Sequence, residues 1–273
     1  MPRKAPTLPR SVAVALRRAA PSSLRIKDVE TCTTIASYNI HKCVGTDGKF
    51  DPARTAAVIA ELDADIVALQ EVDERYGRRA GLLDLETIAG AANLTPLHIP
   101  ANGASHGWHG NMILARKGKV HEVHTLRLPG VEPRGALIVD LEYNDTPLRI
   151  IAAHLGLLRQ SRSLQAKALL DAANGVDRPT ILLGDLNEWR VRNRSSLLTL
   201  LPEFGPLDAV LPSFPSGYPI LALDRILTRP PGMIAALEVH QSPLARIASD
   251  HLPIKAFLNL DGVRHLASQP DLV

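Results

Sequence analysis

The sequence has little cysteine and no long apolar run. Its two cysteines, Cys32 and Cys43, have no CxxC spacing and flank one predicted strand. This argues against a disulfide-stabilised fold and favours a reducing compartment, so we expect a cytoplasmic protein. No apolar run approaches the roughly 20 residues that cross a bilayer. Arginines interrupt the N-terminal segment in which a secretory signal would have its apolar core.

Aromatic residues are also scarce, and the basic residues are concentrated at the N-terminus. Residues 1–27 contain seven basic and no acidic residues. Of the 31 basic and 28 acidic residues in the chain, 24 and 28 therefore lie beyond residue 27, a net charge of −4. A nucleic-acid-binding domain normally carries a basic surface or aromatic stacking platforms, and aromatics are only 4% of this chain. The composition favours a compact ligand over a long polynucleotide.

The basic N-terminal segment has two interpretations. Its apolar residues fall on one side of a helix and two arginines on the other, which would suit peripheral contact of residues 1–27 with an anionic membrane. The apolar stripe is short and mostly alanine, so it buries little area, and a solvated tail is favoured. We predict a basic tail over residues 1–30, one domain over residues 31–260 and a C-terminal tail over residues 261–273.

From Cys32 onward, short apolar runs alternate with helical patterns. Strands are predicted at Thr33–Tyr38, Asp65–Leu69, Asn111–Ala115, Ala136–Leu141, Leu148–Ala153, Thr180–Leu183, Asp224–Thr228 and Pro253–Leu258. Helices are predicted at Pro52–Leu62, Leu83–Ala92 and Gln160–Asn174. Many strands with few helices in one chain of this length predict two packed sheets with helices outside.

Polar side chains stand at the ends of most predicted strands. The stretch ILLGDLNEWR, residues 181–190, leads a buried strand directly into Asp185 and Asn187. The other polar ends are Asn39, Glu71, Asn111, His154, Asp224, Asp250 and His251. A sheet holds its strand ends at an edge, so side chains at the tips of neighbouring strands can converge on one site. Each residue alone would suit a turn, a core histidine or a surface pair, but the joint pattern favours a functional site.

Seven segments that carry these residues resemble the endonuclease/exonuclease/phosphatase superfamily. They are YNIH, LQEV, GWHGNMILAR, AHLGL, GDLNEWR, LDRIL and SDHLPI, in the order of that family, from about residue 33 to residue 258. The nearest resemblance is to a small bacterial subgroup, although HLGLLR here is one residue longer than the subgroup's HLGLR, which shifts Arg159. The resemblance implies an α/β fold, a four-layered α/β/β/α sandwich of two mixed sheets flanked by helices.

The resemblance also implies hydrolysis of a phosphate ester with a divalent metal. In the family pattern, Asn39, Glu71 and Asp250 match the metal ligands. Oxygen ligands without thiolates suit Mg²⁺ or Mn²⁺. Such chemistry is consistent with the residue types, because the anionic oxygens around phosphorus must be neutralised and a water molecule activated.

The remaining motif residues match groups that act on the phosphate. Asp185 matches the residue that orients or deprotonates the attacking water, His251 the imidazole on the reacting phosphate, and Asp224 the partner of that imidazole. Three further residues match contacts to the phosphoryl oxygens, namely Asn111, His154 and Asn187.

Residues near the motifs are candidates for substrate binding. Trp189 and Trp108 could stack on a ligand or support their loops. The arginines after GDLNEW and HLGL suit phosphate, but such a run more often forms a solvated face. These arginines are Arg159, Arg162, Arg190, Arg192 and Arg194, and His109 and Arg134 are further candidate donors.

We therefore predict a monomeric phosphodiesterase that directs water at phosphorus, with a lipid headgroup or another small phosphoester as its substrate. The alternative within the same family is a DNA endonuclease or exonuclease. A third alternative, a catalytically silent scaffold, would have no chemical reason to retain both Asp224 and His251.

Overall fold

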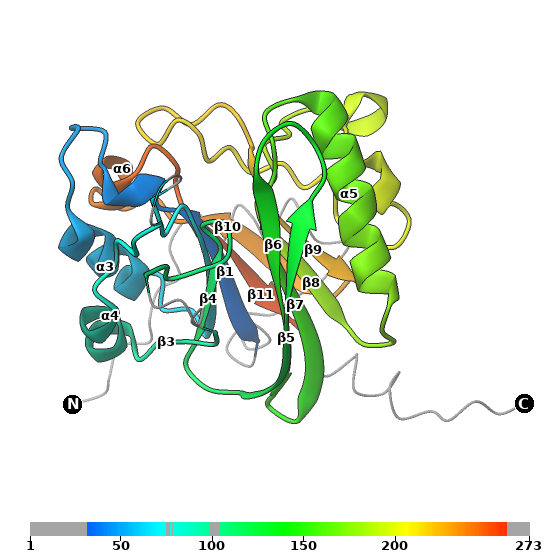
Figure 1. The fold of residues 1–273 in the computed structure, drawn as a ribbon, viewed down its shortest axis with the longest axis horizontal. Helices are drawn as coiled ribbons and strands as arrows, with labels where there is room; N and C mark the ends of the chain where they lie inside the picture. The colour runs from blue at the N-terminus through cyan, green and yellow to red at the C-terminus, as the bar shows by residue number, and fades with distance from the viewer. Residues whose placement is uncertain (1–31, 75–76, 78, 99–103, 261–273) are drawn as a thin grey trace, which may run out of the picture.

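The computed structural model describes residues 32–74, 77, 79–98 and 104–260, and these form a sandwich of two sheets (Figure 1). Both predicted tails lie outside the described residues. The six-stranded sheet has the order β10-β11-β1-β2-β4-β3, in which only the β1–β2 pair is parallel. Its strands are β1 (Thr33–Asn39), β2 (Ile66–Gln70), β3 (Thr95–Pro96), β4 (Met112–Ala115), β10 (Ile234–Val239) and β11 (Ile254–Leu258).

The five-stranded sheet has the order β5-β6-β7-β8-β9, and only its β7–β8 pair is parallel. Its strands are β5 (Lys119–Leu128), β6 (Arg134–Tyr143), β7 (Thr146–His154), β8 (Thr180–Asp185) and β9 (Asp224–Arg229). Both sheets are therefore mixed, as predicted.

Helices cover the outer face of each sheet (Figure 1). The six-stranded sheet is covered by α3 (Pro52–Glu61), α4 (Leu85–Ala92) and the short α6 (Ala245–Ala248). The five-stranded sheet is covered by α5 (Arg159–Asn174) and the 3₁₀ turn η3 (Leu198–Leu200). Two further 3₁₀ turns are η1 (His41–Cys43) and η2 (Arg192–Arg194). The four-layered α/β/β/α prediction is confirmed.

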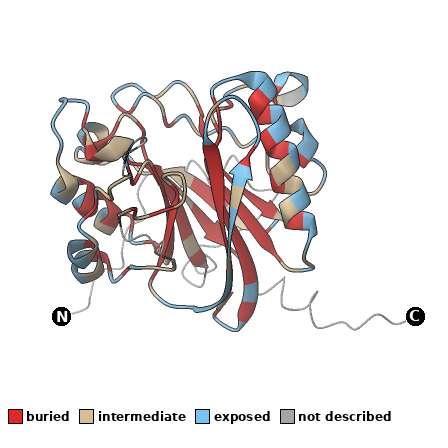
Figure 2. Cartoon of the chain, viewed as in Figure 1, coloured by how far each residue is buried: buried red, intermediate tan, exposed pale blue. Residues whose placement is uncertain are grey.

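The central strands are buried on both faces, and their residues alternate between two apolar layers. On β8, Ile181 and Leu183 pack between the sheets, whereas Leu182 packs under α5. On β1, Ile35 faces the other sheet and Ala36 faces the helices of its own side. Figure 2 shows the resulting core, with exposed surface confined mainly to helices, loops and β5. This alternation decides which side chains enter the space between the sheets.

All eight predicted strands and three predicted helices are present, with ends within two residues of those predicted. Asp51 caps α3 by accepting a hydrogen bond from Arg54 N at 2.9 Å, and Asn93 ends α4 in the left-handed conformation. The predictions missed the strands β3, β5 and β10 and the short helix α6. β5 is polar and exposed at most positions, so its sequence does not have the apolar alternation of a core strand. No helix in the described part of the chain is long and apolar enough to span a membrane.

Candidate active site

Three of the predicted site residues form a row across the five-stranded sheet. His154 at the end of β7 is in register with Asp185 at the end of β8. Asp185 is in turn in register with Asp224, the first residue of the antiparallel β9. The pairing of the strands therefore places these three side chains side by side at one edge of the sheet.

The row faces the other sheet because residues two apart on a strand share a face. Asp185 follows Ile181 and Leu183 at this spacing, and both pack between the sheets. Asn39 follows Ile35 on β1 in the same way, and its register partner on β2 is Gln70. The apolar layer between the sheets thus ends in polar side chains at one edge.

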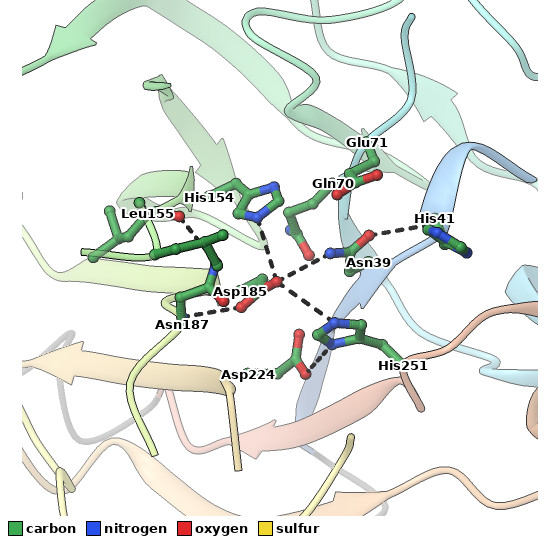
Figure 3. Close-up of polar contacts among 12 residues, drawn as sticks. Asn39, His41, Gln70, Glu71, His154, Leu155, Asp185, Asn187, Asp224 and His251 are labelled. Carbon is green, nitrogen blue, oxygen red and sulfur yellow. Dashed lines mark hydrogen bonds and ion pairs between the residues drawn. The ribbon is translucent and has the colours of Figure 1, made fainter. Parts of the chain in front are cut away.

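Asp185 is the centre of this polar cluster (Figure 3). Its Oδ2 accepts a hydrogen bond of 3.0 Å from Nδ2 of Asn39, across the two sheets. The same oxygen lies 3.4 Å from Nε2 of His154 and 3.7 Å from Nε2 of His251. Its Oδ1 accepts a hydrogen bond of 3.0 Å from the backbone N–H of Asn187. The carboxylate is therefore buried and held in one orientation by donors from several loops and strands.

His251 is held in place by Asp224. Nδ1 of His251 lies 2.8 Å from Oδ2 of Asp224, and the Ser213 hydroxyl donates to the same oxygen. Burial would lower the pKa of His251, but Asp224, Asp185 and Asp250 together raise it to about 10. His251 is consequently an imidazolium at neutral pH, and its Nε2 is on the side of Asp185.

His154 has the opposite charge state. Burial lowers the pKa of His154 to about 4, although Asp185 opposes the shift. A neutral His154 with its proton on Nε2 can donate to Asp185 Oδ2, and it leaves no positive charge there. Asp185 therefore lies between one charged and one neutral imidazole, which gives the two histidines different roles.

Glu71 lies directly after β2, beside this cluster (Figure 3). Burial would raise the pKa of Glu71, but the protonated form of His154 and the ammonium group of Lys42 hold it below its ordinary value. At neutral pH, where His154 is neutral, Lys42 supplies the positive charge beside the ionised Glu71. Oε2 of Glu71 lies 2.9 Å from Nζ of Lys42, but this Glu71 oxygen has no partner in hydrogen-bond geometry. Lys42 reaches it from η1, whose three residues all have positive φ, at 45°, 54° and 60°.

Asn39 and Asp250, two of the predicted metal ligands, both lie close to His41. Oδ1 of Asn39 accepts a hydrogen bond of 3.1 Å from the backbone N–H of His41, and Oδ1 of Asp250 lies 3.8 Å from Nδ1 of His41. The Ser249 hydroxyl binds the carbonyl of Asn39 at 2.7 Å, which ties the loop before β11 to the end of β1. The three predicted metal ligands offer only oxygen atoms, and the buried Glu71 oxygen without a hydrogen bond fits a hard divalent cation.

Comparisons with known proteins agree with this geometry. Residues 36–251 match the Endonuclease/Exonuclease/phosphatase family. The chain belongs to this family. Members are metal-dependent phosphoester hydrolases, and this chain is an enzyme of that class. No curated protein matches the chain in sequence.

Solved structures of the family share the fold. An endonuclease/exonuclease/phosphatase from Beutenbergia cavernae is 23% identical, with a TM-score of 0.63 over 83% of this chain and 72% of its own. A mannosyl-6-phosphatase from Bacteroides thetaiotaomicron is 17% identical, with a TM-score of 0.59 over 83% and 99%. D. rerio TDP2 in complex with a single-strand DNA product is 18% identical, with a TM-score of 0.59 over 84% and 99%.

A second cluster of potential metal ligands lies away from this edge. Glu122, His124 and Asp140 place one ligand atom each within 4.8 Å of one another on β5 and β6. However, both oxygens of Asp140 accept hydrogen bonds of 2.7 Å from Arg149, and Arg178 lies 3.5 Å away. The guanidinium groups already neutralise this carboxylate, which makes the cluster a poor cation site.

Asn111 and Asn187 have internal partners in the structure. The Asn111 amide is fully buried, and its Nδ2 donates to the carbonyls of Trp108 and Gly135 at 3.1 and 3.0 Å. Nδ2 of Asn187 donates to the carbonyl of Leu155 at 3.0 Å. In this arrangement Asn111 holds the turn at Trp108 against β6, and one amide proton of Asn187 is used to position its own loop.

The arginines predicted to contact the substrate lie in three different environments. Arg134 is buried and lines the cavity that contains Glu71 and His154. Arg159 is exposed at the first residue of α5 and does not line that cavity. Arg190 stacks on the half-exposed Trp189, with its guanidinium 4.5 Å from the ring centre. His109 lines the same cavity as Arg134.

Arg162 has neither the phosphate-binding position nor the solvated position that its sequence context suggested. It is buried, and its guanidinium donates to the Ser196 hydroxyl at 3.1 Å and the Gly156 carbonyl at 3.1 Å. It also pairs with the fully buried Glu188 at 3.5 Å. Arg162 is therefore a structural clamp that joins the loop after β7 to the loop after β8.

The sequence analysis missed three residues that the structure places in or beside the site. Lys42 pairs with Glu71, Gln70 lies in register with Asn39, and Ser213 binds Asp224. Lys42 directly follows YNIH and Gln70 lies inside LQEV, so their places in the motifs were a usable signal. Ser213 lies in a proline-rich loop with no such signal.

Proposed function

We propose that this enzyme is a phosphodiesterase that directs a water molecule at phosphorus, using Mg²⁺ or Mn²⁺, on a lipid headgroup or another small phosphoester. The observation that carries the proposal is the position of Asp185, whose Oδ2 is within 4 Å of both His154 and His251. One buried carboxylate between a neutral and a charged imidazole can accept a proton beside a group that stabilises anionic oxygens.

Each residue has a distinct task in the proposed reaction. Asn39 orients Asp185, which accepts the proton of the attacking water. The His251 imidazolium donates through Nε2 to a phosphoryl oxygen while Asp224 fixes its Nδ1. His154, held in the neutral form, donates to Asp185 or to the phosphate. A divalent cation held by Glu71, Asn39 and Asp250 would supply positive charge for the oxygens around phosphorus.

Exposed apolar side chains around the site support a lipid substrate. Leu157 and Leu158 follow β7 and are 64% and 54% exposed. Trp189 follows β8, and Tyr218 and Ile220 precede β9, at 47%, 78% and 61% exposure. All five lie in loops connected to the strand ends that carry His154, Asp185 and Asp224. Apolar loop tips around a polar site suit contact with the headgroup region of a bilayer.

The alternative function is a DNA endonuclease or exonuclease. Arg190 stacked on the exposed Trp189 forms a platform on which a nucleic-acid base could stack, and this specific observation favours it. Outside the basic segment of residues 1–27 the chain is acidic, which weighs against a long duplex. Membrane contact through residues 1–27, a cytoplasmic location and a monomeric state stay predictions, and residues 1–27 lie outside the described residues.

The proposed function is tested by a substrate screen with Mg²⁺ and Mn²⁺. The panel contains bis(p-nitrophenyl) phosphate, sphingomyelin, inositol phosphates, supercoiled plasmid and abasic duplex. The Asp185→Asn protein, purified in parallel, excludes a contaminating nuclease. We expect turnover of the diester and of a small or lipid phosphoester. Efficient plasmid or duplex cleavage that falls steeply with salt would instead support the nuclease.

A further inference from the structure

An open groove lies beside the candidate active site, next to the turn between β5 and β6. Its lining includes Arg79, Trp108, His109, Arg127, Val131 and Arg134. The groove shares four lining residues with the cavity that contains Glu71 and His154, namely Arg79, His109, Pro133 and Arg134. The groove is thus continuous with the proposed reaction centre and extends away from it along the end of β5.

The groove carries positive charge that is only partly neutralised. Arg127 stands near the end of β5, opposite Gly135 in the sheet register, and the next pair is Leu128 and Arg134. Arg134 is paired with Glu132 at 2.9 Å. Glu132 also accepts a hydrogen bond from the backbone N–H of Leu157. The single acid in the groove lining is therefore already engaged.

The other two arginines face the groove without an acidic partner among the described residues. Neither Arg79 nor Arg127 has an ion pair within 4.0 Å of its guanidinium in that part of the chain. Burial lowers the pKa of His109, and the positive charges of Arg79 and Arg127 lower it further. His109 is further fixed by a contact of 3.1 Å between Nδ1 and the Pro133 carbonyl. Two guanidinium groups around a neutral imidazole form a local positive potential that an anion would relieve.

The wall of the groove is rigid and partly apolar. Trp108 and His109 meet edge to face with ring centres 5.0 Å apart, and Nε1 of Trp108 donates to the Leu126 carbonyl at 3.3 Å. Val131 is exposed at the turn. A flat organic group that bears a negative charge would meet both the apolar wall and the arginines.

We propose that this groove binds a second anionic group of the substrate, so that the enzyme prefers phosphodiesters that carry a phosphate or carboxylate beyond the scissile phosphorus. The inference rests on the proposed function and narrows its substrate class. Arg127 and Arg79 bind the second anion, and Arg134, anchored by Glu132, connects that subsite to the cavity of Glu71 and His154.

The test uses two esters that differ by one charge. These are bis(p-nitrophenyl) phosphate and the analogue in which one nitro group is replaced by a carboxylate, which has nearly the same shape. Both release p-nitrophenolate, so kcat/KM is measured for each with wild type, Arg127→Ala and Arg127→Glu. Lys119→Ala is the matched control, because it removes an exposed cation from the other end of the same strand.

Wild type is expected to prefer the carboxylate ester, and the preference ratio should fall about tenfold in Arg127→Ala and further in Arg127→Glu. The ratio in Lys119→Ala should remain within twofold of wild type. Equal kcat/KM for the two esters in wild type, or a ratio that both Arg127 variants leave at the wild-type value, would overturn the inference.

Binding separates this inference from the proposed function. Dissociation constants of both esters are measured by calorimetry on Asp185→Asn and on Asp185→Asn with Arg127→Ala. If Asp185→Asn binds the carboxylate ester more tightly and Arg127→Ala removes this preference, the result supports anion binding in the groove. That conclusion would hold even if wild type turned over neither ester, because the absence of turnover would contradict only the proposed phosphodiesterase activity. Equal binding of both esters to Asp185→Asn overturns the groove, whatever the turnover.

Discussion

The Nδ2 amide of Asn39 donates a hydrogen bond of 3.0 Å to Oδ2 of Asp185, although the two residues come from different sheets. This bond joins β1 to β8 at the edge where the proposed chemistry takes place. Because an aspartate in place of Asn39 keeps an oxygen for the cation but has no amide proton, the Asn39→Asp substitution isolates the orienting role.

We expect Asn39→Asp to lower kcat by about 10- to 100-fold, since the new carboxylate repels Asp185 and no longer orients it. The affinity for Mg²⁺, measured by calorimetry, should not fall. Asn193→Ala, the control, removes an exposed amide in η2 and should retain wild-type kcat. A wild-type kcat in Asn39→Asp would show that the bond has no part in catalysis.

The pairing of His251 with Asp224 predicts a loss of stability at alkaline pH. The pKa of His251 is raised from 6.5 to about 10, so the folded state binds its proton more tightly than the unfolded chain does. The contribution is fully present below about pH 6.5 and is lost as the pH rises through about 10. Urea unfolding of wild type and Asp224→Asn, without metal, should show the largest stability difference near pH 6 and a smaller one near pH 10. A difference that is constant with pH would contradict this assignment.

Glu71 is expected to be the main anionic contact of the cation. Glu71→Gln keeps the shape of the side chain but removes its charge, so the affinity for Mg²⁺ should fall about tenfold or more. Turnover at a fixed low Mg²⁺ concentration should fall with it and recover in part at high Mg²⁺. Glu86→Gln, an exposed substitution on α4, provides the control. Unchanged Mg²⁺ affinity in Glu71→Gln would place the cation elsewhere.

Arg162 is expected to affect stability strongly. Arg162→Ala removes one of the two guanidinium partners of the fully buried Glu188 and also removes the hydrogen bonds to Ser196 and Gly156, so the free energy of unfolding should fall by about 2 kcal/mol or more. Arg159→Ala, three residues earlier and exposed, should change it by less than about 0.5 kcal/mol. Urea denaturation of both variants checks the contrast. Equal stabilities of the two variants would contradict the clamp.

The sequence was sufficient where a local pattern determines the structure. The apolar runs that end in His154 and Asp185 identified both the strands and the polar edge, because alternation fixes the face on which the last residue lies. β5 was missed because its polar residues are exposed on both faces. Arg162 was misinterpreted because a buried and a solvated arginine look alike in sequence. The ion pair of Lys42 depends on the left-handed turn of η1, which no residue pattern indicated.

The central claim is that Asp185 activates the water that breaks a phosphorus–oxygen bond. The most direct test is kcat for bis(p-nitrophenyl) phosphate with saturating Mg²⁺ in wild type, Asp185→Asn and Asp145→Asn. Asp145 is the control because it lies in the exposed turn between β6 and β7, at the opposite end of β7 from His154. We predict that Asp185→Asn lowers kcat by about 100-fold or more while Asp145→Asn retains it and both variants fold. A properly folded Asp185→Asn protein with wild-type turnover would contradict the mechanism.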